Sequence, residues 1–430
     1  MKLSSLFPTT AALLLAAAPA MAQDKFVYPS YPKPGETKRA DADNTRRIVP
    51  APDRNYWPFS GLSGPGAPVT EETARGGWAS DLINVKYKGP VPRSYPTAPW
   101  TDDDSGSAVA RGMMPALRPI WDVHLRDTMI CPGGDGNYYM TGTTGDNCWA
   151  QNDGIELYVS ADLRNWRYLG LIWSIERDGT WEKNWTMREG VPFRTIWAPE
   201  IHFIQGNYYI VTCMSGVGMG ILRSKSGRAE GPYVHVVQDT PIKGGIDSTL
   251  FEDDDGRIYF TYGAAAQIRE IKRDFSGFAG DWQPIEYDMP PLPPSPERPG
   301  PTGGPRVGFE GATLFKANGR YYLGCCDFVE GRYSFRFATS NQLRGPYRDR
   351  HEGPAGGGGG NVFRDQTGQW WLTYFGNDKQ MPFREKPGLA AIDFDARGRV
   401  VFAKHQPFVA PYPGSREGNA SSATFTVDSK

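Results

Sequence analysis

The chain has 430 residues, a formal net charge of −1 and an aromatic content of 13%. This near balance of charge gives no electrostatic reason to expect nucleic acid or an anionic membrane as a partner, and a neutral partner fits better. The length suits one large β domain or two ordinary domains, with ample aromatic material for a core.

The first 22 residues predict a cleaved secretory signal. A short basic start precedes an apolar run over residues 11–18, and Ala20-Met21-Ala22 has the small-residue pattern of a cleavage site. The alternative is a membrane anchor, but the apolar run is shorter than the roughly 20 residues that a span needs. We therefore expect a periplasmic or secreted protein.

Two terminal segments lack the patterning of a folded domain. Residues 23–115 are rich in Pro, Gly and charge with little periodicity, which predicts an extended arm that wraps the domain. Residues 413–430 predict a C-terminal tail. The domain itself is expected over residues 116–412.

The cysteines are too few and too irregularly spaced for a disulfide framework. We expect them to be buried as small hydrophobic residues, with a Cys131–Cys148 bridge as the alternative in an oxidising compartment. The five are Cys131, Cys148, Cys213, Cys325 and Cys326.

One short pattern occurs five times: a turn with glycine, a pair of aromatic or β-branched residues, and a strand-like run. Each copy follows another apolar stretch, so each predicts a β-hairpin whose glycine supplies positive φ. Five such hairpins predict an all-β, five-bladed β-propeller, whereas a β-sandwich would need five matching hairpins by coincidence. The glycines are Gly136, Gly206, Gly256, Gly319 and Gly368.

Two longer stretches interrupt the repeat. One runs from Trp173 to Thr195 between the first two predicted blades, and the other from Pro290 to Pro305 between the third and fourth. Long inserted loops on a rigid scaffold often carry binding residues. We expect both to form walls of a binding cleft.

Acidic residues recur at one distance from the repeat glycine. Counting back nine residues gives Asp127, Asp247 and Glu310 in the first, third and fourth blades, but Trp197 and Gly359 in the second and fifth. If these acids open the innermost strands, they converge at one mouth of the channel. Like charges so close raise at least one pKa, which calls for a functional explanation.

Glycosidic bond hydrolysis is the chemistry that uses such a set of acids. One carboxylate acts as base or nucleophile, and a carboxylic acid of raised pKa protonates the leaving oxygen. A third acid can orient the substrate and the proton. The alternative is that the three residues merely cap the loops at which their strands begin.

At these residues the sequence resembles glycoside hydrolase family 43, a clan of five-bladed propellers. The resemblance is carried by Arg126-Asp127, Trp197-Ala-Pro-Glu-Ile-His, Ile246-Asp247 and Glu310-Gly-Ala, each beside its hairpin. It implies an inverting enzyme with Asp127 as general base, Asp247 as pKa modulator and Glu310 as general acid. An inverting site leaves roughly 6.5 to 9.5 Å between base and acid for a water molecule.

The sequence departs from the family pattern in two ways. Thr128, Ser248 and Ala312 stand where proline is common, which indicates a divergent member. The fifth blade has only glycines over Gly356–Gly360, where many members place a histidine that helps to hold a central metal ion. We therefore expect no required cofactor and do not predict the central calcium ion that the resemblance would imply.

Four more residues are candidates for the substrate pocket, each with a structural alternative. Arg126 and Arg336 could bind sugar hydroxyls or lie on the solvated surface. Trp197 could stack on a sugar ring or pack in the core. Glu200 lies two residues from His202, which we expect to be a structural histidine.

The sequence thus predicts an exo-acting glycosidase whose partner is an oligosaccharide or polysaccharide of plant or algal origin. Arabinofuranose, xylose and galactose are the leading candidates for the released sugar. The alternative is a carbohydrate-binding propeller that has lost catalysis. A protein-binding propeller of the WD type is disfavoured because its Gly-His and Trp-Asp signature is missing.

Overall fold

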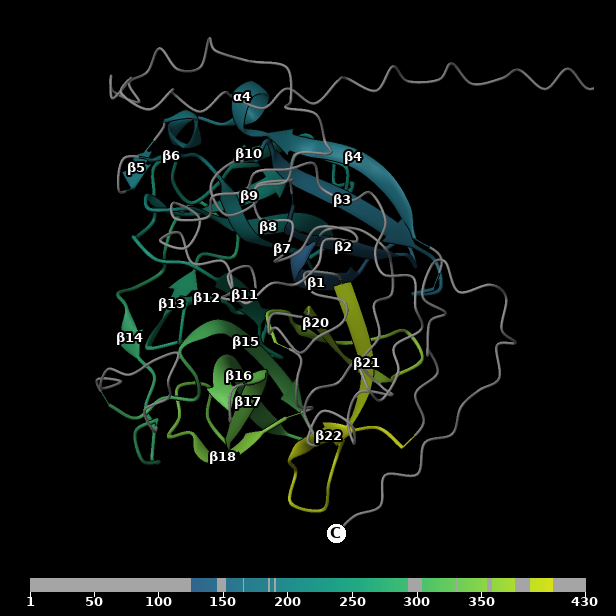
Figure 1. Ribbon diagram of the computed structural model, residues 1–430, viewed down its shortest axis with the longest axis vertical. Helices are drawn as coiled ribbons and strands as arrows, with labels where there is room; N and C mark the ends of the chain where they lie inside the picture. Colours follow the sequence, from purple (N-terminus) through teal and green to yellow (C-terminus); the bar gives the residue numbers. More distant parts are fainter. Residues whose placement is uncertain are drawn as a thin grey trace, which may run out of the picture.

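The computed structural model describes residues 125–144, 152–164, 166–184, 186–188, 191–292, 304–329, 332–353, 358–375 and 387–404. These residues form five four-stranded antiparallel sheets arranged in a ring, with one further two-stranded sheet (Figure 1). The prediction of an all-β, five-bladed propeller is confirmed. The predicted signal (1–22), arm (23–115) and tail (413–430) lie outside the described residues.

Each blade uses four consecutive strands, with the first strand innermost. Blade one has β1 (Arg126–Pro132), β2 (Tyr138–Thr143), β3 (Gly154–Ser160) and β4 (Arg167–Ser174). Blade two has β7 (Ile196–Ile204), β8 (Asn207–Met214), β9 (Gly218–Ser224) and β10 (Tyr233–His235). Blade three has β11 (Ser248–Glu252), β12 (Ile258–Tyr262), β13 (Gln267–Ile271) and β14 (Gln283–Pro284).

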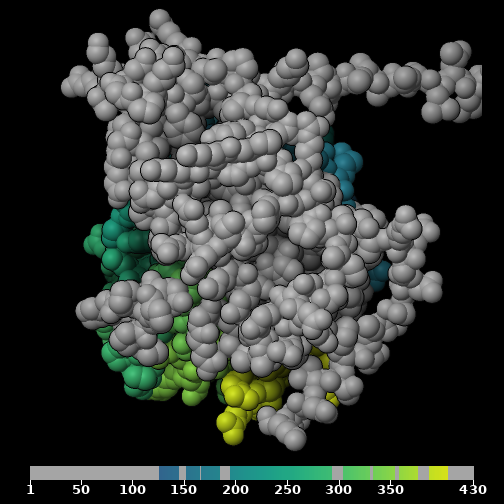
Figure 2. Space-filling view, viewed as in Figure 1, coloured from purple at the N-terminus to yellow at the C-terminus, as the bar shows by residue number. Residues whose placement is uncertain are grey.

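The last two blades follow the same order. Blade four has β15 (Glu310–Ala317), β16 (Arg320–Val329), β17 (Arg332–Ser340) and β18 (Arg348–Glu352). Blade five has β19 (Val362–Arg364), β20 (Trp370–Phe375), β21 (Pro387–Phe394) and β22 (Val400–Phe402). In the space-filling view, described residues of blades three and four form the lower left of the surface, and blade five forms the lower edge, in yellow (Figure 2).

The paired aromatic residues of the repeat explain how the ring is held together. Successive side chains of a strand point to opposite faces, so the two members of a pair serve different interfaces between blades. Tyr138 packs toward blade five and Tyr139 toward blade two. Likewise Tyr208 packs toward blade one and Tyr209 toward blade three. Five buried clusters result, one between each pair of neighbouring blades.

A buried asparagine joins the last blade to the first. The Asn361 side chain accepts a hydrogen bond from Ile130 N at 3.0 Å and donates one to Ile130 O at 3.0 Å. It therefore pairs with β1 as a strand backbone would. A parallel bridge between Thr128 and Gly360 lies beside it. Because a buried unpaired amide is costly, this contact favours closure of the ring.

The hairpin turns are of two lengths. In blades two and four, two residues with positive φ connect the strands: Gln205-Gly206 and Asn318-Gly319. This pattern is typical of the type I′ turn that matches strand twist. In blades one, three and five, five residues connect the strands. The difference changes the position of the acidic residues, as described below.

The first predicted insertion has a structure of its own. It contains α4 (Ile175–Asp178), the 3₁₀ turn η4 (Trp181–Lys183), β5 (Thr186–Arg188) and β6 (Val191–Phe193). Glu182 in η4 lies 2.9 Å from Nε2 of His235 on the outer strand β10, and both side chains are buried. This end of the insertion is thus anchored at the outer edge of blade two. Its role as a wall of the cleft stays a prediction.

The second predicted insertion is described only at its ends. Pro291 and Pro305 form a β-bridge, and the Arg350 guanidinium donates to Pro290 O at 3.0 Å. The residues between them lie outside the described chain. The prediction that this stretch forms a wall of the cleft is therefore open.

The described cysteines are buried free thiols, as expected for small hydrophobic residues; they are Cys131, Cys213, Cys325 and Cys326. Cys148 lies outside the described residues. Among the helices that the structure describes, none is long and apolar enough to cross a bilayer.

Candidate active site

A left-handed backbone residue marks the start of the innermost strand in every blade. Its φ is 51° at Asp127, 44° at Ala198, 54° at Asp247, 65° at Gly311 and 65° at Gly359. In blades one, two and four this residue lies in a β-bulge. Bulges re-aim side chains and are common beside active sites. Aspartate and glycine tolerate positive φ better than most residues, which fits four of the five positions.

The strand registers correct one expectation from the sequence. Glu310 pairs with Cys326 immediately before the bulge, as Arg126 pairs with Thr143 and Trp197 with Cys213. Glu310 is therefore equivalent to Arg126 and Trp197, and not to the two aspartates. The prediction of one shared register for all three acids was wrong.

Turn length is the physical reason for this error. The short turn of blade four brings Gly319 closer to the strand than the five-residue connections bring Gly136 and Gly256. Gly319 follows the last paired residue of its strand by two positions, whereas Gly136 and Gly256 follow theirs by four. The strand of blade four has one more residue between its left-handed residue and the turn, so a count of nine from the glycine ends one residue earlier there. Asp127 and Asp247 are equivalent, and Glu310 stands one position before them with a side chain one methylene longer.

Asp127 is half-buried and held by a directional chain of hydrogen bonds. Ala198 N–H donates to Oγ1 of Thr143 at 2.7 Å, and Thr143 Oγ1 donates to Oδ2 of Asp127 at 2.6 Å. The hydroxyl thus accepts from the backbone of Ala198 and directs its single proton at the carboxylate. This arrangement favours the ionised form of Asp127.

Asp247 contacts the backbone of the acid-bearing strand. Gly311 N–H donates to its Oδ2 at 3.0 Å. The pKa of Asp247 lies well above its usual range because of burial, and the charges of Glu310 and Asp127 add to this effect. The Gly311 hydrogen bond and the charge of Arg126 act in the opposite direction.

Glu310 accepts a hydrogen bond at Oε1 from the Tyr333 hydroxyl, with an oxygen–oxygen distance of 2.8 Å. The pKa of Glu310 is raised to about 7: burial is the largest cause, the charge of Asp127 adds to it, and the Tyr333 hydrogen bond and the charge of Arg126 act in the opposite direction. A carboxyl group with this pKa can carry a proton near neutral pH.

The structure thus brings Asp127, Asp247 and Glu310 close enough that their charges act on one another. Arg126 is the cation that opposes this repulsion. It is buried, and its guanidinium lies 4.5 Å from the centre of the Phe375 ring. Three carboxyl groups beside one arginine cannot all ionise without cost, which is the pattern of a site that handles protons.

Blade five contributes space to this cluster. A Cβ atom on Gly359 would lie 1.9 Å from the Phe375 ring, on which Arg126 rests, and one on Gly358 would lie 2.7 Å from the Tyr333 ring. Any side chain at either position would displace these neighbours. These glycines of the fifth blade therefore make room for two rings of the site.

The other predicted pocket residues differ in their surroundings. Arg336 forms an ion pair with the fully buried Asp327, with Nε 2.8 Å from Oδ2. Glu200 is buried on β7, and its carboxylate lies 3.6 Å from Nε2 of His202. Trp197 is half-buried and packs against the cluster between blades two and three. Their predicted contacts with substrate stay predictions.

Reasoning from the sequence missed Thr143 and Tyr333. Thr143 ends β2, and Tyr333 lies at the start of β17, 23 residues after Glu310. Neither belongs to the repeat that identified the acids. Their places follow from the strand pairing, in which Thr143 lies opposite Arg126 and Tyr333 opposite Phe328.

We tested whether side chains near the axis could hold the calcium ion that the resemblance implies. Within the described ranges, no three Asp, Glu, His or Cys side chains are grouped so as to hold a metal ion. At the fifth blade, Gly358 and Gly359 offer backbone only. The side chains in the described part of the chain do not fit such a site, and the proposed mechanism uses no step through a metal.

The fold and the carboxyl cluster together define a class, the propeller glycosidases. The family model described as "Glycosyl hydrolases family 43" matches residues 116–400. The chain therefore belongs to glycosyl hydrolase family 43.

Individual relatives are distant. An extracellular endo-α-(1→5)-L-arabinanase of Bacillus subtilis (strain 168) is 26% identical over 62% of this chain and 83% of its own length. A provisionally named β-xylosidase of Escherichia coli (strain K12) is 26% identical over 71% of this chain, which spans only 62% of that protein. The crystal structure of a thermostable family-43 glycoside hydrolase matches 70% of this chain and 99% of its own, with a TM-score of 0.50 and 20% identity.

Proposed function

We propose that the protein is an inverting, exo-acting glycosidase that releases neutral sugars from oligosaccharides. The observation that carries the proposal is the coupled cluster of Asp127, Asp247 and Glu310, in which burial and mutual repulsion raise two pKa values beside a single arginine. Membership of family 43 supports the reaction class. The three roles are those that the resemblance to family 43 implies, and the surroundings of each carboxyl group support them.

Glu310 is proposed as the general acid. With a pKa of about 7 it still carries a proton at neutral pH, and it can give that proton to the leaving oxygen as the glycosidic bond breaks. The electron pair of the broken bond stays on the leaving oxygen, which this proton neutralises.

Asp127 is proposed as the general base. The hydrogen bond from Thr143 to Oδ2 stabilises the carboxylate form, which can take a proton from water. The activated water then forms the new bond at the anomeric carbon, on the face opposite the leaving group. One water molecule is consumed for each bond that is broken.

Asp247 is proposed as the modulator of Glu310. It binds the N–H of Gly311, the residue next to the acid, and so links the position of Glu310 to its own charge state. Because the two carboxyl groups repel each other when both are ionised, the charge of either one disfavours ionisation of the other.

The substrate is proposed to be a plant or algal oligosaccharide or polysaccharide with terminal arabinofuranose, xylose or galactose. Support comes from the names of two relatives, an arabinanase and a β-xylosidase. The near-neutral net charge of the chain fits an uncharged substrate. Export is proposed from residues 1–22, and the B. subtilis relative is named as extracellular.

The test is a panel of aryl glycosides and polysaccharides with the wild type and Glu310→Gln. We expect the variant to lose about 10²- to 10⁴-fold in kcat on poor leaving groups and far less on activated ones, because only poor leaving groups need the proton. Proton NMR of the first-formed product should show inversion at the anomeric carbon.

Equal losses on both kinds of leaving group would remove Glu310 from the role of acid. Retention of configuration would overturn the inverting mechanism. Failure to cleave any substrate, together with measurable sugar binding, would favour the alternative of a non-catalytic carbohydrate-binding propeller.

A further inference from the structure

Tyr333 is a buried side chain that contacts one of the proposed catalytic groups directly. Its Oη lies 2.8 Å from Oε1 of Glu310, and the residue is only 4% exposed. Its ring contacts Phe309, Phe328 and Phe375, with centroid distances of 6.4, 5.3 and 6.0 Å. Three rings from two blades thus hold the phenol in one orientation.

The fifth blade is shaped to admit this ring. A methyl group on Gly358 would lie 2.7 Å from Cδ1 and 2.8 Å from Cε1 of Tyr333, and 3.4 Å from Sγ of Cys326. The first two distances are shorter than side chains tolerate. Because Gly358 is equivalent to Glu310 in the strand register, the fifth blade lacks a side chain at the position where the fourth carries its acid.

We propose that Tyr333 is the positioning residue of Glu310: it occupies Oε1, so that Glu310 carries its transferable proton on Oε2. The proposal rests on the role of Glu310 as general acid. After Glu310 has given up its proton, its carboxylate can only accept hydrogen bonds, so the Tyr333 phenol must be the donor. This hydrogen bond therefore stabilises the carboxylate that the proton transfer produces.

The electrostatics agree with this geometry. Burial raises the pKa of Tyr333 well above its usual range, and the charges of Cys326 and Glu310 add to the effect. The phenol therefore stays protonated and remains a donor. Its hydrogen bond lowers the pKa of Glu310, against the upward effect of burial. Tyr333 thus makes Glu310 a stronger acid than its surroundings alone would allow.

The test compares Tyr333→Phe with a matched control, Tyr322→Phe. Tyr322 is 1% exposed, lies in the same sheet, and donates from Oη to Gly398 O at 2.9 Å, away from the acids. In Tyr333→Phe we expect the alkaline limb of the kcat/KM profile to rise by about one pH unit, since a hydrogen bond to a charged group is lost. At neutral pH, kcat on a poor leaving group should fall about tenfold with KM unchanged.

A direct titration separates this proposal from the catalytic one. The carboxyl carbon of Glu310 can be followed by ¹³C NMR in glutamate-labelled protein and assigned by its loss in Glu310→Gln. We expect its pKa to rise in Tyr333→Phe and to stay unchanged in Tyr322→Phe. Gly358→Ala should act in the same direction as Tyr333→Phe, because its methyl group displaces the ring.

The experiments distinguish failure of the positioning role of Tyr333 from failure of the acid role of Glu310. If Glu310→Gln shows the expected dependence on leaving group but Tyr333→Phe moves neither the limb nor the titration, Tyr333 only packs and the proposal is overturned. If Glu310→Gln lacks that dependence, the acid assignment fails, and the titration alone decides whether Tyr333 controls Glu310. A rise in the Glu310 pKa with an unchanged kcat on poor leaving groups would also contradict a positioning role.

Discussion

Aspartate residues occur at both ends of the propeller, but their pKa values are shifted in opposite directions. Asp247 and Asp255 flank β11 in one hairpin. At the site end, burial and neighbouring charges hold the pKa of Asp247 well above its usual range. At the turn end, the backbone N–H and guanidinium of Arg257 hold the pKa of Asp255 below it. The ionised form of an aspartate is thus disfavoured at the site end and stabilised by hydrogen bonds at the turn end.

The turn end repeats this satisfied arrangement in several blades. Asp135, Asp365 and Asp395 each accept a backbone N–H from two residues further along, at 2.8 to 3.1 Å. Such local side-chain bonds are typical of aspartate in turns. The site end has carboxyl groups that face one another instead. The two ends therefore differ in whether their carboxyl groups repel one another or are paired with hydrogen-bond donors, and this difference distinguishes a catalytic end from a structural one better than the number of acidic residues does.

The largest expected effect is a difference in kcat between substitutions of two aspartates in the first hairpin, Asp127 and Asp135. Asp127→Asn should lower kcat by about 10²- to 10⁴-fold, because an amide cannot take the proton from water. Asp135→Asn should leave kcat unchanged and cost about 0.5 to 1 kcal/mol of unfolding free energy, since Asp135 accepts from Asn137 and Tyr139 at an exposed turn. Steady-state kinetics and urea denaturation measure the two quantities. Full activity in Asp127→Asn would remove that residue from the role of base.

The second effect is the pH dependence of catalysis. Glu310 must be protonated to act as the acid, and its pKa is about 7, so kcat/KM should fall above about pH 7, approaching tenfold for each pH unit. In Glu310→Gln, assayed with an activated leaving group, this limb should disappear. A limb that persists in the variant would show that another group sets it. The turn aspartates should not contribute a limb, because hydrogen bonds lower their pKa values.

The third expected effect is that asparagine substitutions at the two ends change the free energy of unfolding in opposite directions. The folded-state pKa of Asp247 is raised, so its contribution to stability is present below about pH 4 and is lost as pH rises through that pKa. Asp247→Asn should therefore stabilise the fold at pH 8 relative to the wild type, while activity falls. Denaturant titrations at pH 8 and pH 5 measure this change.

Asp365 is the matched case at the turn end. Burial acts to raise its pKa, but hydrogen bonds from Thr367, Trp371 and Gln369 outweigh it, and the pKa is lowered. Its contribution is present above about pH 4 and is lost as pH falls. Asp365→Asn should destabilise the fold at pH 8 by about 1 to 2 kcal/mol, because part of this network loses its acceptor. Stability changes of the same sign at both positions would contradict the comparison.

The sequence could predict the fold because the repeat records it directly. Each copy contains a turn glycine and two large residues, one for the interface with each neighbouring blade. Five copies therefore predict five blades. It could also select Asp127 and Asp247, which share both spacing and backbone conformation. Glu310 was found by a count that mixes two turn lengths, and its register became clear only from the strand pairing.

Contacts between distant strands were beyond the reach of the sequence. Tyr333 meets Glu310 although β17 and β15 are separated by β16 in the sheet, and no repeat position marks it. Gly358 and Gly359 lie in a run of glycines, and their purpose depends on which rings the neighbouring strands place against them. Local patterns reveal propensity and spacing, but complementary shape arises only when the blades pack.

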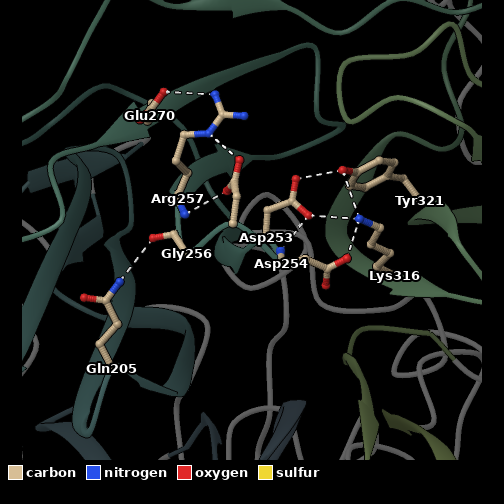
Figure 3. Close-up of polar contacts among 9 residues, drawn as sticks. Gln205, Asp253, Asp254, Gly256, Arg257, Glu270, Lys316 and Tyr321 are labelled. Carbon is tan, nitrogen blue, oxygen red and sulfur yellow. Dashed lines mark hydrogen bonds and ion pairs between the residues drawn. The ribbon is translucent and has the colours of Figure 1, made fainter.

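The smallest effect concerns the ion pairs between the turns of blades three and four. Lys316 Nζ lies 2.6 Å from Asp254 and 3.3 Å from Asp253, and Asp253 also accepts from the Tyr321 hydroxyl at 2.7 Å (Figure 3). Lys316→Gln should lower unfolding free energy by at most about 1 kcal/mol, less in high salt, because Asp254 is exposed and screened. No change in kcat is expected, since the site lies at the other end of the strands.

A neutral contact in the same region provides the control for this last prediction. Gln205 in the turn of blade two donates from Nε2 to Gly256 O at 3.2 Å, again between neighbouring blades (Figure 3). Gln205→Ala should have a similarly small effect, but one that does not depend on salt. If Lys316→Gln lowered kcat as strongly as Asp127→Asn does, the two ends of the propeller would be coupled, and the division between a strained end and a satisfied end would fail.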